Sequence, residues 1–379
     1  FLLASNTNEL TYDYRGQTGK NFSECMSSIC LSAANDPTPS PTPDPGSGIG
    51  DIVSFGPSGG NSQLSCNGKF ITTKDIDDSQ VYRQSVDTGE KVLITSTKDG
   101  VPSTGDSQQV NDISCDGRYA LVTLDEYGSV DFDGLPGADS NENDRGALYR
   151  KDLETGEVVR VDTLSNGEKK RNKWSIDEAV LSSDGRFVLF ETPDVQLAGL
   201  EEAAWQSEDW SRTLAYRKDM NTGELSVVVT KPDGSPGDGF TQSGGYGNGV
   251  SDDGSKVTFI YDGDDLVPGV SGKNVYVKDF ETNTVSLVSS DSQGNRLDDF
   301  GNWGSGSTIS PDGSKVVFTS NGENGQAQIM MKDLSTGQLN VISKNTNGIE
   351  GNGYSGGGNF NFSGDNKYLV YNSSASNIV

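Results

Sequence analysis

One short phrase recurs six times in this chain and constrains its fold more than any other feature. Each copy runs serine, any residue, Asp or Asn, then Gly or Asn: S-C-N-G, S-C-D-G, S-S-D-G, S-D-D-G, S-P-D-G and S-G-D-N, with the serines at positions 65, 114, 182, 251, 310 and 363. Asp side chains cap the local backbone and Gly supplies a positive φ, so each copy predicts a tight turn. Apolar residues alternate beside the turns, as at Val257, Phe259 and Tyr261. Each copy therefore predicts a β-hairpin.

A second phrase follows five of the six copies and predicts a second hairpin. It reads Y-R-K-D-L-E-T-G-E at 149–157 and Y-R-K-D-M-N-T-G-E at 216–224, and it recurs at 81–90, 275–284 and 329–338. A β-branched run follows each copy, so every unit has four antiparallel strands. Units of this kind, repeated at irregular intervals of about 50 to 70 residues, predict a β-propeller, whose blades bury faces that no single blade could bury.

The two phrases in this order, S-P-D-G-x-x-V-x-F and then V-Y-x-K-D-x-x-T-G, resemble the TolB-like β-propeller repeat family, a relative of the WD repeats. The resemblance covers residues 51–379. It implies an all-β propeller, for which we expect six blades, with seven as the alternative. Propellers of this type serve as protein-docking platforms, periplasmic scaffolds, substrate-gating domains of serine peptidases and occasionally enzymes. The resemblance therefore carries over the turn residues and no active site.

The two ends of the chain are expected to close the ring together. The last copy of the first phrase is followed by only one more strand, so its blade lacks an outer half. The segment D-I-V-S-F-G-P-S-G-G (51–60) reads as an outer strand that completes this blade, and residues 10–20 are a further candidate strand. The alternating prolines of 37–50 predict a semi-rigid linker. Residues 1–36 are then a leader or small module, either a processed tail or an anchor.

Four cysteines suggest two disulfides. Cys25 and Cys30 are close in sequence, and a local bridge between them is the simplest interpretation. Cys66 and Cys115 occupy the same position in two successive copies of the first phrase, so they can bridge if their Cα atoms approach within about 7 Å. Such bridges indicate an oxidising location: extracellular, cell-surface or periplasmic.

Composition excludes several classes of function. The chain carries 55 acidic and 29 basic residues, a formal net charge of −26, which repels nucleic acid and anionic lipid. No stretch approaches the roughly 18 consecutive apolar residues of a membrane helix, so we expect no membrane insertion. The chain has no histidine, which removes the commonest general base and excludes a Ser-His-Asp triad or a His-containing zinc site.

The segment 131–146 is the candidate metal site. It concentrates oxygen ligands, and four of them alternate as in a calcium loop: Asp139, Asn141, Asn143 and Asp144. Hard cations take several carboxylate and amide oxygens on a bent backbone. The alternative is an ordinary solvated loop.

Aromatic residues precede the first strand of several units and form the candidate ligand site: Trp174, Tyr246, Trp303 and Tyr354. Loops that lead into innermost strands converge near the axis of a propeller, so these rings could line one mouth of the channel. Such a platform suits sugar rings or a partner's peptide. The alternative is that each ring packs between two blades. Trp205 and Trp210 lie in an insertion that is expected to include a short helix.

These observations favour a non-enzymatic propeller outside the cytoplasm that binds a protein partner or assembles with itself. The first alternative is a lectin-like module that binds polysaccharide. A carboxylate-based carbohydrate-active enzyme is the second, but most Asp residues are explained by turns, and no catalytic residue can be singled out.

Overall fold

The computed structural model describes residues 2–5, 30–32 and 52–54 and most of 62–378. Within that last range the gaps are 76–77, 79, 104–107, 125–146, 169–175, 177–178, 194, 200–213, 244–248, 298–305 and 357–359. The statements below concern the described residues.

Six antiparallel sheets carry the S-x-D-G turns, and we number them in chain order. Sheet 1 contains β4 (Phe70–Lys74), β5 (Val81–Ser85) and β6 (Lys91–Leu93), with an isolated bridge between Leu64 and Ile71. Sheet 2 contains β7 (Gln108–Ile113), β8 (Tyr119–Leu124), β9 (Ala147–Asp152) and β10 (Val158–Arg160). Sheet 3 contains β11 (Ala179–Leu181), β12 (Phe187–Thr192), β13 (Leu214–Asp219) and β14 (Leu225–Val227).

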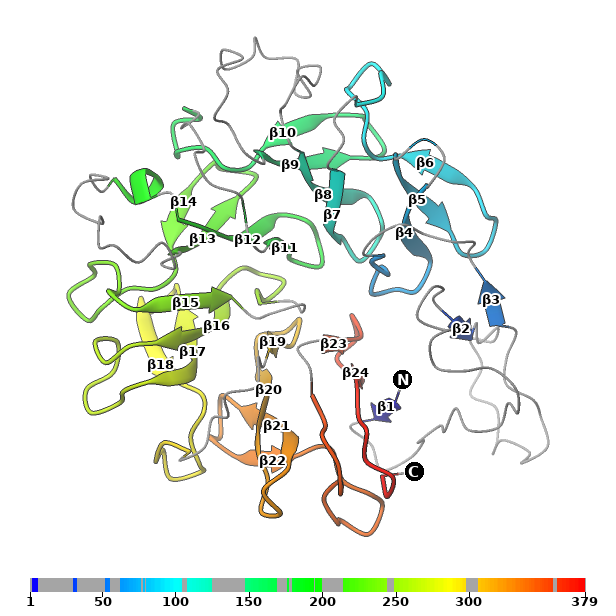
Figure 1. The fold of residues 1–379 in the computed structure, drawn as a ribbon. Coiled ribbons are helices and arrows are strands. Elements are labelled where there is room, and N and C mark those ends of the chain that lie inside the picture. The colour runs from blue at the N-terminus through cyan, green and yellow to red at the C-terminus, as the bar shows by residue number, and fades with distance from the viewer. Residues whose placement is uncertain are drawn as a thin grey trace.

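The later sheets repeat this plan. Sheet 4 contains β15 (Phe240–Ser243), β16 (Lys256–Asp262), β17 (Lys273–Asp279) and β18 (Thr284–Leu287). Sheet 5 contains β19 (Ser307–Ile309), β20 (Lys315–Asn321), β21 (Ala327–Asp333) and β22 (Leu339–Val341). Sheet 6 contains β23 (Asn361–Phe362), β24 (Tyr368–Tyr371) and the N-terminal strand β1 (Leu2–Ser5). Sheets 2 to 5 have four strands in consecutive order, and the sheets follow one another around a common centre (Figure 1).

Both recurring phrases form the tight turns that the sequence predicted. In the first phrase the five glycines have φ between 67° and 75°, and Asn366 takes the sixth place with φ 61°. In the second phrase Asn283 replaces Gly with φ 55°. Asn is the residue that tolerates this left-handed region best after Gly, so both exceptions keep the turn.

Hydrophobic packing joins each sheet to the next. The central strands β12, β16 and β20 are buried on both faces, because each sheet lies between two others. One cluster of buried side chains joins sheets 1 and 2, and further clusters join 2 and 3, 3 and 4, 4 and 5, and 5 and 6. In the described part of the chain, no such cluster joins sheet 6 to sheet 1. The core is therefore a series of interfaces, as expected when no sheet can bury its faces alone.

The N-terminal strands pair differently from the expectation. The expectation that residues 51–60 complete the last sheet is wrong for the part of this segment that the structure describes, because β3 (Ile52–Ser54) pairs with β2 (Cys30–Ser32). β24 instead pairs with β1, in a register that sets Leu3 opposite Val370. Short strands of three or four residues carry too little pattern to reveal their partners in advance. Residues 10–20, the other candidate strand, lie outside the described residues.

The only helical element in the described residues is the 3-10 helix η1 (Val195–Ala198). It opens the insertion for which a short helix was expected, whereas Trp205 and Trp210 lie outside the described residues. None of the described residues form a helix long and apolar enough to cross a membrane.

Candidate functional site

The S-x-D-G turns meet at the centre of the six sheets and form the candidate site. In every turn the Ser hydroxyl donates to the Asp or Asn side-chain oxygen two residues later, over 2.6–2.8 Å. The same hydroxyl accepts the backbone N–H five residues later. The Asp oxygen also accepts the backbone N–H two residues beyond it. These hydrogen bonds, which recur in all six turns, explain the Ser and Asp residues of the turns without a catalytic role.

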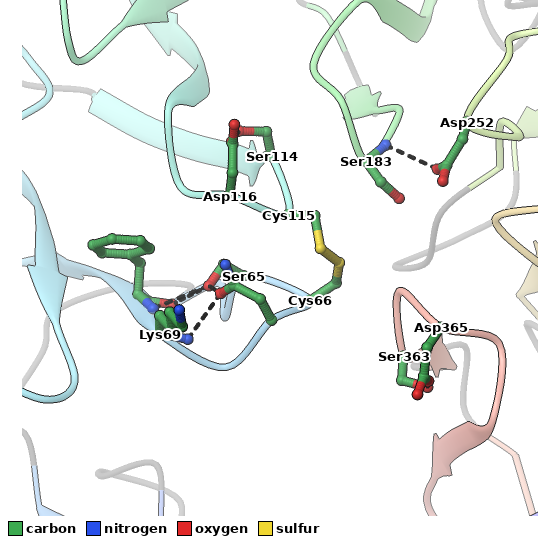
Figure 2. Close-up of a disulfide and its surroundings, with 12 residues drawn as sticks. Ser65, Cys66, Lys69, Ser114, Cys115, Asp116, Ser183, Asp252, Ser363 and Asp365 are labelled. Atoms are coloured by element: carbon green, nitrogen blue, oxygen red, sulfur yellow. Dashed lines mark hydrogen bonds between the residues drawn. A yellow bond between two sulfur atoms is a disulfide. The ribbon is translucent and has the colours of Figure 1, made fainter. Parts of the chain in front are cut away.

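The second residue of each turn contacts the second residue of at least one other turn. These six residues, which we call the axial ring, are Cys66, Cys115, Ser183, Asp252, Pro311 and Gly364. Figure 2 shows the Cys66–Cys115 disulfide together with the turns of sheets 1, 2 and 6 and with Ser183 and Asp252 from sheets 3 and 4. The ring is therefore built by six segments that are far apart in the sequence.

Hydrogen bonds link four members of the axial ring in turn: Cys115, Ser183, Asp252 and Pro311. The Cys115 N–H donates to the Ser183 carbonyl over 2.8 Å, and the Asp252 N–H donates to the Pro311 carbonyl over 2.9 Å. The Ser183 N–H donates to the Asp252 carboxylate over 3.3 Å (Figure 2). These bonds hold adjacent sheets in register at the centre.

The disulfide was anticipated from the matching positions of its two cysteines. It joins sheets 1 and 2, with Cα atoms 4.6 Å apart. Gly364 of sheet 6 lies directly against it: a Cβ atom at this position would meet the Cys66 sulfur at 2.8 Å and the Cys115 sulfur at 3.0 Å. Only glycine lets the backbone come this close to the two sulfur atoms, so the last turn packs directly against the disulfide.

Two carboxylates near the centre have perturbed acidity. Asp112 on β7 accepts the N–H of Ile113 and, from sheet 3, the N–H of Leu181, both over 2.8 Å. Burial raises the pKa of Asp112 to about 6, against the opposing effect of these two hydrogen bonds. Burial also raises the pKa of Asp252. Perturbed carboxyl groups occur at functional sites, but here both bond backbone N–H groups of the neighbouring sheet.

A set of lysines that the sequence did not single out holds the sheets together. They occupy the same place in the second phrase, and each ammonium reaches into the preceding sheet: Lys151, Lys218, Lys278 and Lys332. Lys218, for example, donates to the Thr163 carbonyl and hydroxyl and to the Leu164 carbonyl over 2.8–3.1 Å. Burial lowers the pKa of these lysines, to about 8 for Lys151. Sheet 1 has Gln84 at this place.

Arginines of the same phrase reach the opposite way. Arg83, Arg150 and Arg217 each donate to a turn-glycine carbonyl of the following sheet. Each guanidinium also lies over an aromatic ring of its own sheet, 4.5 Å from the Phe70 centroid in the case of Arg83. The Arg and Lys side chains of the second phrase therefore form contacts between adjacent sheets.

Most of the predicted site residues lie outside the described residues. These are the predicted ligand residues Trp174, Tyr246 and Trp303, the predicted metal ligands Asp139, Asn141, Asn143 and Asp144, and the predicted disulfide residue Cys25. Cys30 lies in β2. Tyr354 is half-buried, its carbonyl accepts the Ser374 N–H over 2.8 Å, and burial raises the pKa of its hydroxyl. Among the described residues, no three His, Cys, Asp or Glu side chains are grouped so that they could hold a metal ion.

Comparison with solved structures finds similar proteins that include β-propellers. No protein-family model matches it, and no curated protein matches its sequence. TolB from Acinetobacter baumannii matches in structure with 19% identity and a TM-score of 0.38, over 74% of this chain and 53% of TolB, so the chain spans about half the length of that relative. The Cps50 (Swd1) β-propeller domain from Myceliophteria thermophila matches with 12% identity and a TM-score of 0.41, over 83% of this chain and 79% of that domain. A TolB structure and a β-propeller domain are therefore among the solved structures to which this chain is similar.

An enzyme also matches. An oligogalacturonate lyase in complex with manganese has 15% identity and a TM-score of 0.39, over 75% of this chain and 67% of the lyase. Likeness at this level concerns the fold alone, because propellers host unrelated functions.

Proposed function

We propose that this chain is a six-bladed propeller that acts outside the cytoplasm as a non-enzymatic module for binding a protein partner or for self-assembly. The observation that carries the proposal is the use of the recurring polar groups. The turn Ser and Asp residues and the buried lysines all bond the backbone of their own or an adjacent sheet. A ring whose repeated polar residues hydrogen-bond its own backbone is a rigid scaffold. Such a scaffold is suited to present binding surfaces to a partner.

Ring closure is part of this proposal. β1 supplies the third strand of the last blade through its pairing with β24, and residues 10–20 supply the fourth. The first and last blades then meet, and the chain ends close the ring as the recurring phrases predict.

The proposed location rests on the Cys66–Cys115 disulfide, because such bridges persist in oxidising compartments. The Cys25–Cys30 bridge belongs to the same proposal. Mass analysis of the purified chain under non-reducing conditions should recover both linked peptides. Recovery of free thiols at all four positions would contradict an extracellular or periplasmic location.

A direct test of the function uses the purified chain, immobilised and exposed to the extracellular fraction of its source. We expect one protein, or further copies of this chain, to be retained in a fixed ratio and released when the propeller is unfolded by urea. Retention of polysaccharide instead would favour the lectin-like alternative. Turnover of any polysaccharide that is lost on mutation of an Asp pair would overturn the non-enzymatic proposal.

The lectin-like alternative has its own test in the aromatic residues that precede the first strands. A glycan array would compare the wild type with Trp303→Ala and Tyr354→Ala. Binding that both substitutions abolish would support a sugar platform, and an array on which the wild type binds nothing would exclude it.

Calcium binding at Asp139, Asn141, Asn143 and Asp144 remains a proposal for the segment 131–146. If calcium stiffens this segment, removal by a chelator should lower the melting temperature, and added Ca²⁺ should restore it. The Asp139→Asn variant should not respond. An unchanged melting temperature in the wild type would speak against the site.

A further inference from the structure

The contact between the last sheet and the first lacks two features that join several other pairs of successive sheets. In sheets 1 to 3 the residue two positions after the turn glycine is aromatic, and its ring covers the turn glycine of the next sheet. These residues are Phe70, Tyr119 and Phe187. A Cβ atom at Gly117, Gly185 or Gly254 would lie 2.2–2.4 Å from that ring. The corresponding aromatic residue of sheet 6 is Tyr368, which is 43% exposed, and nothing lies within 4 Å of a Cβ atom at Gly68 in sheet 1. Among the described residues, sheets 6 and 1 thus lack this aromatic contact, and sheets 4 and 5 have Lys256 and Lys315 in place of the aromatic residue.

The lysine contact is also missing between these two sheets. Gln84 stands where the later sheets have a buried lysine that bonds the preceding sheet. Leu64, at the start of sheet 1, is 40% exposed and is one of four large apolar side chains that are exposed in the described part of the chain, with Tyr368 as another. In the part of the chain that the structure describes, the hydrophobic cluster of sheet 6 lies on its other side, where Phe362 and Tyr371 pack against Val317 and Ile329 of sheet 5.

The disulfide provides one contact of sheet 6 with sheets 1 and 2. Both sulfur atoms lie within 3.0 Å of the position that a Cβ atom of Gly364 would take, so the backbone of the last turn packs against the disulfide. Figure 2 shows the disulfide with Ser363 and Asp365 of that turn. The two cysteine turns belong to sheets 1 and 2. The Cys66–Cys115 bond therefore determines the surface against which the last turn of sheet 6 packs.

We infer that the Cys66–Cys115 disulfide is a redox-sensitive latch that keeps sheet 6 closed on sheet 1. Reduction by a dithiol adds two electrons and two protons to the disulfide and yields two thiols, while the dithiol becomes a disulfide. The sulfur atoms then separate from about 2 Å to a non-bonded distance of roughly 3.5–4 Å. Since the Gly364 backbone fills the space beside them, this separation pushes the last turn outward, and sheet 6 opens at the side where the described residues form no hydrophobic cluster with sheet 1.

Hydrogen exchange, followed by mass spectrometry with and without a dithiol, tests the latch on the full chain. Reduction should accelerate exchange in β23 and β24 by about tenfold or more, whereas β20 and β21 of sheet 5 should be unaffected. The Cys25→Ser/Cys30→Ser variant should respond as the wild type does, and the Cys66→Ala/Cys115→Ala variant should not respond. No acceleration, uniform acceleration, or acceleration confined to the two cysteine turns would overturn the inference.

A second measurement isolates the contact with Gly364. The Gly364→Ala substitution should lower the melting temperature by about 3 °C or more when the disulfide is present, because the new methyl group collides with both sulfurs. In the Cys66→Ala/Cys115→Ala background the sulfurs are gone, so the same substitution should cost less than half as much. Equal losses in the two backgrounds would show that the last turn does not rest on the disulfide.

Discussion

In each of sheets 2 to 5, one buried lysine ammonium group hydrogen-bonds the preceding sheet. The residue Lys218 is 3% exposed, and its acceptors are two backbone carbonyls and one hydroxyl, which carry no formal charge. Lys218→Met should lower the free energy of unfolding by about 1–3 kcal/mol, since carbonyl oxygens of Thr163 and Leu164 lose a buried donor. Urea unfolding measures the loss. The matched control Lys98→Met, at an exposed lysine, should change stability by less than about 0.5 kcal/mol.

Asp112 should make stability depend on pH in the opposite sense to most carboxylates. Its pKa is raised to about 6 in the folded chain, against 3.8 as the ordinary value, so the folded state binds the proton more tightly. The stability from this group is fully present below about pH 4 and is lost as pH rises through about 6, by at most about 3 kcal/mol. Urea unfolding at several pH values, compared between wild type and Asp112→Asn, isolates the effect. A difference between the two proteins that does not vary with pH would contradict it.

At the scale of the elements, the turns are fixed by backbone conformation and also by packing against the next sheet. Gly185 and Gly167 both have positive φ, at 73° and 82°. A Cβ atom at Gly185 would meet the Tyr119 ring at 2.4 Å, whereas one at Gly167 would meet nothing within 4 Å. Gly167→Ala should therefore cost only the conformational penalty of about 1–2 kcal/mol. Gly185→Ala should cost clearly more, by roughly a further 1–3 kcal/mol.

Thermal or urea unfolding of the two glycine variants gives the comparison directly. Because both substitutions introduce the same residue at the same kind of conformation, their difference reports the contact between sheets 2 and 3. Equal losses would mean that Tyr119 moves aside and that the turns do not lock the sheets.

The sequence predicted those elements whose cause is local. A turn such as S-P-D-G is encoded in four adjacent residues, and the equal positions of Cys66 and Cys115 revealed their bridge. Features that depend on a neighbouring sheet escaped prediction. Lys218 sits in a polar hairpin phrase that looks solvent-exposed, and nothing near Gly364 in sequence reveals a disulfide more than 200 residues away. The pairing of β1 with β24 was missed for the same reason.

The whole molecule carries a large net negative charge that its fold must tolerate. The formal net charge of −26 is spread over a ring that unfolding would expand, so mutual repulsion favours the unfolded chain. Salt screens this repulsion, with a Debye length that falls from about 30 Å at 0.01 M to about 3 Å at 1 M. The melting temperature should therefore rise by several degrees between 0.01 M and 0.5 M NaCl.

The salt response can be separated from general effects of solutes on burial. Sodium chloride and potassium chloride should act alike at equal ionic strength, and sucrose of the same osmolality should produce little of the early rise, since it carries no charge. The rise should also be steepest below about 0.2 M, where the Debye length shortens most. A melting temperature that falls with salt in this range would show that the ion pairs between strands, such as Arg186 with Asp219 at 2.7 Å, outweigh the net repulsion.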